Sequence, residues 1–127
     1  MSSEIIRKAD IERSKRETEV IQLTAEQIIK DFALFGMDIH FSGILDLAYD
    51  ELYDQMLKHI TYLMDSNQQK LLSLLYQIDL SEKKVLHEYS LEQEVSYNDV
   101  LTSMIIEREI VKVLTRIYFR DKNASSL

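Results

Sequence analysis

The clearest chemical signal in the sequence is a carboxylate inside an apolar helix pattern. At about 100° per residue, the segment MIIEREIVKVL (104–114) places Glu107 on a stripe with apolar side chains above and below it. A carboxylate in such surroundings needs a hydrogen bond or a cation, or it stays protonated. We therefore expect Glu107 to be buried and partnered. The stripe consists of Val100, Met104, Glu107, Val111, Leu114 and Tyr118.

Three interpretations of Glu107 stay open on the sequence. The favoured one is structural, with the hydroxyl of Tyr49 or Tyr53, or an arginine, as the partner of a buried polar group. A second places Glu107 at a subunit interface, where a polar group in an apolar seam specifies register. In the third, Glu107 lines a pocket for a small molecule, or binds a single metal ion together with His59 and Asp46.

Known catalytic and metal-binding patterns are missing from the chain. A di-metal helical bundle needs Glu-x-x-His pairs, but the residues three positions before its three histidines are Met37, Met56 and Lys84. The sequence has no cysteine, and its two glycines cannot form the usual phosphate-binding loops. We therefore expect a protein that is not an enzyme and that binds no cofactor.

The overall charge argues against nucleic acid as the main partner. The 127 residues carry a net charge of −7, whereas binding to a phosphate backbone requires a concentrated basic surface. The N-terminus lacks a secretory signal and no apolar run is long enough to span a membrane, so we expect a cytoplasmic protein. A regulator that contacts nucleic acid is the weakest alternative, and it would use Arg13, Lys15, Arg16, Arg116 and Arg120.

The elements that would position these residues are predicted to be helices, because the chain has no proline and few turn residues. We predict an all-α, four-helix-bundle-like domain over 20–122, preceded by a charged helical arm or tail (1–19) and followed by a tail (123–127). The main helices are expected at 24–35, 43–65, 66–78 and 97–121, with a short connecting helix at 81–89. Their predicted N-caps are Thr24, Ser66, Ser81 and Ser96.

The last helix also suggests contacts with another subunit. A second apolar row lies beside the Glu107 stripe, and the two rows together cover about half of the helix circumference. We therefore predict a homodimer, with the arm at 3–19 available to a protein partner. The expected interface residues are Ile106, Ile110, Val113, Ile117 and Tyr118.

Two segments, LLYQIDLSEKKV (74–85) and IIEREIVKVLTRIYF (105–119), resemble segments of small, uncharacterised helical bacterial proteins. The resemblance implies a bacterial, cytoplasmic and helical protein, and no activity. The function expected from the sequence is non-catalytic and based on protein–protein contacts.

Overall fold

The protein is all-α, as the sequence predicts. The computed structural model describes the backbone of residues 3–125 and the side chains of residues 16–124. Within this part of the chain there are five α-helices, one short 3-10 helix and no strand. The elements are α1 (Ser3–Ala33), η1 (Leu45–Leu47), α2 (Ala48–Ser66), α3 (Gln68–Ile78), α4 (Glu82–Leu91) and α5 (Tyr97–Ser125).

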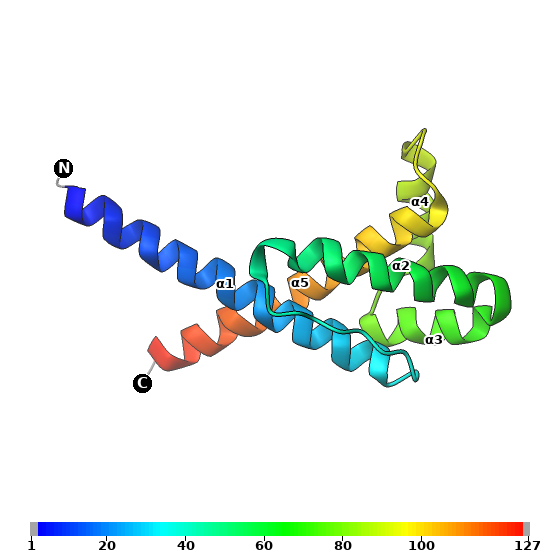
Figure 1. Ribbon diagram of the computed structural model, residues 1–127, viewed down its shortest axis with the longest axis horizontal. Coiled ribbons are helices and arrows are strands. Elements are labelled where there is room, and N and C mark those ends of the chain that lie inside the picture. The colour runs from blue at the N-terminus through cyan, green and yellow to red at the C-terminus, as the bar shows by residue number, and fades with distance from the viewer. Residues whose placement is uncertain (1–2, 126–127) are drawn as a thin grey trace.

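Two long helices set the shape of the molecule. With 31 and 29 residues, α1 and α5 are each about 45 Å long. The N-terminal part of α1 (residues 3–22) and the C-terminal part of α5 (residues 114–125) project from the same end of the body, and we call them the fork (Figure 1). Helix α4 stands at the other end, and α5 packs against α1, α2, α3 and α4. This arrangement is compatible with the predicted four-helix bundle plus one short helix.

The core contains apolar side chains from every helix. On α2, Leu52, Met56, Ile60 and Leu63 are buried, and their spacing of three and four residues places them on one face of the helix. Helix α4 contributes Val85. The other large, fully buried apolar side chains are Ile28, Phe32, Leu74, Ile78, Leu101 and Ile105.

The first helix boundary is predicted wrongly. Thr24 is not an N-cap but a fully buried residue in the middle of α1, which runs without interruption from Ser3 to Ala33. No glycine or proline stops the helix before Gly36, whose φ of 72° lets the chain turn after α1. The predicted boundary between arm and bundle at residues 19 and 20 therefore lies inside a continuous helix.

The other caps follow local side-chain chemistry. Asn67, and not the predicted Ser66, caps α3, because its Oδ1 accepts a hydrogen bond of 3.1 Å from the backbone N–H of Lys70. Ser96 caps α5 as predicted: its Oγ accepts from the N–H of Asp99 and donates to the carboxylate of Asp99. Ser81 occupies the predicted N-cap position of α4, but its side chain makes no capping bond.

Candidate functional site

The carboxylate buried in α5 is Glu109, and the prediction that Glu107 is buried is wrong. Glu109 is fully buried, whereas Glu107 is exposed. The apolar residues of α5 cover about half of its circumference, so more than one stripe fits the helical period. The row that packs into the core consists of Leu101, Ile105, Glu109 and Val113.

Glu109 lies against a second buried carboxyl group, that of Asp31 on α1. The side chain of Asp31 is 2% exposed, and the Nζ atom of Lys112 lies 3.3 Å from Glu109 and 3.7 Å from Asp31. Gln27 donates a hydrogen bond of 3.0 Å from its Nε2 to Asp31, and it accepts one of 2.7 Å from Arg116. This cluster joins α1 to α5 just inside the base of the fork.

Burial sets the protonation of Glu109. Loss of solvent, and then the hydrogen bond and negative charge of Asp31, raise the pKa of Glu109 from 4.5 to about 8, although the ammonium group of Lys112 opposes the shift. Glu109 is therefore protonated at neutral pH, with its buried carboxyl group beside that of Asp31. Neither carboxyl group lines the neighbouring groove, a space of about 320 Å³ bordered by Gln27, Arg108, Lys112, Thr115 and Arg116. The cluster connects α1 to α5 beneath this groove.

The three residues considered for a metal site are not brought together. Asp46 is exposed in η1, and Glu107 is exposed on α5. His59 of α2 is bonded through Nε2 to the backbone oxygen of Asp38, at 2.8 Å. Among the residues that the structure describes, no three His, Cys, Asp or Glu side chains form a cluster that could hold a metal ion.

The two tyrosines expected beside Glu107 have other neighbours. Tyr53 of α2 donates a hydrogen bond to Asp99 at the start of α5, and burial together with this bond raises the pKa of Tyr53 to about 12. Tyr49 borders α1 instead, and partial burial raises the pKa of its phenol above the ordinary value of 10.0. Both tyrosines are partly buried, and neither one neutralises Glu107.

The expected interface row of α5 is largely turned toward the bundle. Val113 is completely buried, so it is wrong as an interface residue, and Ile106 packs against the core. Ile110 and Ile117 are half-buried. The residues of α5 that are open to solvent are instead Val111, Leu114 and Tyr118, which are 49%, 47% and 61% exposed. They form the C-terminal part of the Glu107 stripe, which the sequence predicts to face inward.

An apolar groove continues this exposed row onto α1. Val20 and Ile21 of α1, Tyr49 of α2 and Leu114 of α5 surround a space of about 590 Å³ at the base of the fork. Arg16 lies at the edge of this groove, beside Glu17. The exposed row and this groove form one apolar surface, which we call the fork surface.

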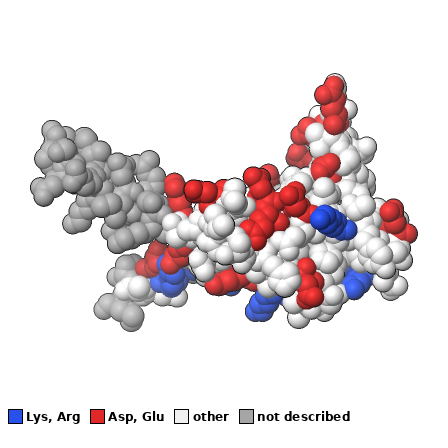
Figure 2. Space-filling view, in the orientation of Figure 1, with Lys and Arg blue, Asp and Glu red and all other residues white. Residues whose placement is uncertain are grey.

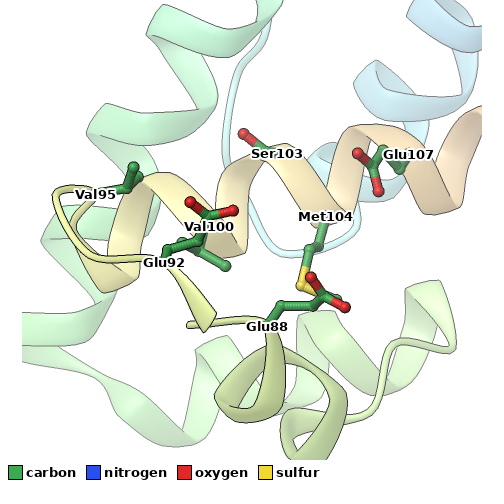
Figure 3. Close-up of a pocket in the computed structure, with 7 residues that line it drawn as sticks. All are labelled: Glu88, Glu92, Val95, Val100, Ser103, Met104 and Glu107. Atoms are coloured by element: carbon green, nitrogen blue, oxygen red, sulfur yellow. The ribbon is translucent and has the colours of Figure 1, made fainter. Parts of the chain in front are cut away.

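A second groove lies between α4 and the first half of α5, with a volume of about 370 Å³. Figure 3 shows the carboxylates of Glu88 and Glu92 on the side of the groove formed by α4, facing Val100 and Met104 of α5, with Glu107 farther along the same helix. We call this groove, which Val95 and Ser103 also line, the acidic groove.

Charge is divided unevenly between the body and the last helix. Residues 23–107 contain fifteen acidic and five basic residues, a net charge of −10. Residues 108–125 contain five basic and two acidic residues, a net charge of +3. Figure 2 shows acidic side chains over the body and α4, with basic ones near the base of the fork and at a few places on the body.

The basic side chains considered for nucleic acid are engaged with acids or amides. Arg120 donates to Glu19 at 2.9 Å and to Asp121 at 3.1 Å. Arg16 pairs with Asp121 at 3.7 Å, and Arg116 donates to Gln27. The side chains of Arg13 and Lys15 lie outside the described residues. The described members of this set therefore form no open basic surface for a phosphate backbone.

Comparison of the chain with known protein families, with characterised proteins and with solved structures gives no match. In the described part of the chain, no helix has an apolar stretch that is long enough to cross a bilayer.

Proposed function

We propose that this is a non-catalytic, cytoplasmic protein that acts through protein–protein contacts and associates with itself as a homodimer. The observation that carries the proposal is the fork surface. Three neighbouring exposed apolar residues of α5, Val111, Leu114 and Tyr118, continue into the groove beside Val20 and Ile21. A continuous apolar patch of this kind on a soluble domain typically marks an interaction site.

The charge pattern favours a second copy as the occupant. Two identical bodies of net charge −10 repel each other over most of their surfaces. The fork is different, because acidic and basic side chains alternate there, as in Arg16, Glu17, Glu19, Arg120 and Asp121. A two-fold interface uses the same patch on both copies, so it needs this mixture of charges around an apolar centre.

An antiparallel pairing of α5 with its copy satisfies both requirements. It places the exposed apolar rows against each other, and it brings Glu107, in the N-terminal half of one helix, toward the basic C-terminal half of the other. The cysteine-free sequence fits the reducing interior of a cell, where disulfides do not form.

Light scattering at several protein concentrations tests the proposal. The chain has a mass of 15.0 kDa, so we expect about twice this mass. Leu114→Glu should shift the protein toward the monomer, because it places a charge in the centre of the fork surface. Leu72→Glu is a matched control, since Leu72 is exposed to the same degree (48%, against 47%) but lies on α3.

The proposal is overturned if the wild-type mass stays at that of a monomer at every concentration. It is also overturned if the protein is a dimer and the two leucine variants dissociate equally. Circular dichroism of both variants shows that any difference arises at the interface and not from loss of the helical fold.

A further inference from the structure

The acidic groove has an apolar floor and a rim that nothing in the described part of the chain neutralises. Met104 and Val100 form the floor, and no side chain among the described residues 16–124 has a hydrogen bond or ion pair with the carboxylates of Glu88, Glu92 or Glu107. A segment that fits this groove must offer apolar side chains to the floor and lysine or arginine to the rim.

The chain itself contains a segment with this chemistry. Residues 5–16, IIRKADIERSKR, have three isoleucines, five basic residues and two acidic ones. Their backbone belongs to α1, and the part of α1 between residues 3 and 15 is about 20 Å long. This end of α1 projects away from the body at the end opposite to α4, so it points away from the acidic groove of its own copy (Figure 1).

We propose that the N-terminal part of α1 from one copy docks in the acidic groove between α4 and α5 of the other copy. The inference rests on the proposed homodimer. In an antiparallel pairing of α5 with its copy, the fork of one copy lies beside the N-terminal half of the other α5. The arm of each copy then approaches the groove of its partner, and the contact forms twice.

The docking gives each part of the surface a role. The apolar rows of α5 supply the centre of the interface, and the two arms supply charge contacts at its ends. Contacts of this type depend on ionic strength, because surface charges are screened within about 8 Å at physiological salt. Salt therefore weakens the contacts of the arms, and it also screens the repulsion between the two acidic bodies.

Charge exchange tests the docking directly. The groove variant is Glu88→Lys with Glu92→Lys, the arm variant is Arg7→Glu with Lys8→Glu, and the combined variant carries all four changes. We expect each pair of changes to raise the dimer dissociation constant about tenfold, which is about 1.4 kcal/mol. The combined variant should return to within about threefold of the wild type, because the opposite charges meet again.

The result that overturns the inference is a combined variant that is no better than either pair alone, or pairs of changes without effect. If the charge exchange gives one of these results but Leu114→Glu still dissociates the dimer, the homodimer is supported and the docking is rejected. If the wild type is a monomer, both proposals fall together. An effect of the groove variant without any effect of the arm variant also overturns the docking, since the groove then takes another basic segment.

Cross-linking gives an independent measurement, because the natural chain has no cysteine. After oxidation, an equal mixture of Ile6→Cys and Glu92→Cys proteins should form a covalent mixed dimer. The control mixture is Ile6→Cys with Tyr76→Cys, a position on α3 that is 90% exposed. Equal cross-linking in the two mixtures contradicts the docking.

Discussion

Replacing Glu109 by glutamine should remove a pH dependence that this one buried side chain gives to the protein. The free carboxyl group titrates at 4.5 in the unfolded chain and at about 8 in the folded protein. Between these values the folded state holds a proton that the unfolded state has lost. The free energy of unfolding therefore falls as the pH rises through this range, and the fall ends once the pH passes about 8.

The size of the effect follows from the two pKa values. Each pH unit within the window costs about 1.36 kcal/mol, and the slope decreases near the folded pKa. From pH 5.5 to pH 7.5, Glu109 should lower the free energy of unfolding by about 2.5 kcal/mol. Glutamine resembles the protonated carboxyl group in size and polarity and does not titrate, so the Glu109→Gln protein should lack this contribution.

Urea unfolding followed by circular dichroism at fixed protein concentration measures the difference. The concentration must be constant because association stabilises the folded state. Glu26→Gln is the matched control, since it makes the same chemical change at an exposed position of α1 outside both proposed contact surfaces. The explanation is refuted if Glu109→Gln keeps the wild-type slope, or if Glu26→Gln loses it.

Two further predictions concern the helix ends. Asn67→Ala should lower the free energy of unfolding by about 1 kcal/mol, since Asn67 caps α3 through the N–H of Lys70. Ser81→Ala should lower it less, because the side chain of Ser81 makes no capping bond. Thermal unfolding of the two variants compares them, and equal losses would contradict the assignment. Asp79 ends α3 with a φ of 63°, so Asp79→Gly should be more stable than Asp79→Ala by about 1 kcal/mol. The same measurement checks this order, and a less stable glycine variant would show that the left-handed backbone is not strained.

The fold class could be predicted because it depends on local features of the sequence. The chain has no proline to interrupt a helix. Two other signals each involve residues that lie close together in the chain: the capping box of Ser96, and the helical spacing of Leu52, Met56, Ile60 and Leu63. Where a local signal competed with another, the prediction failed. Thr24 has the pattern of an N-cap, but no residue before it interrupts the helix, and its side chain is buried.

The candidate site could not be predicted, because it depends on which face of α5 meets the other helices. Glu109 lies in a segment whose apolar residues fit more than one helical stripe, and its neighbour Asp31 is far away in the sequence. A signal did exist: Glu109 lies four residues after Ile105 and four before Val113, just as Glu107 lies between Met104 and Val111. Nothing in the spacing alone chooses between these two acids.

The sequence by itself therefore determined that the chain forms helices, where most of them begin and end, and that one acid must lie among apolar side chains. Only the tertiary structure decided that this acid is Glu109, that the row of Val111, Leu114 and Tyr118 is open to solvent, and that α1 and α5 extend together beyond the core. The physical reason is that helix formation depends on neighbours within about four residues. The rotation of an apolar helix is instead fixed by the surfaces against which it packs.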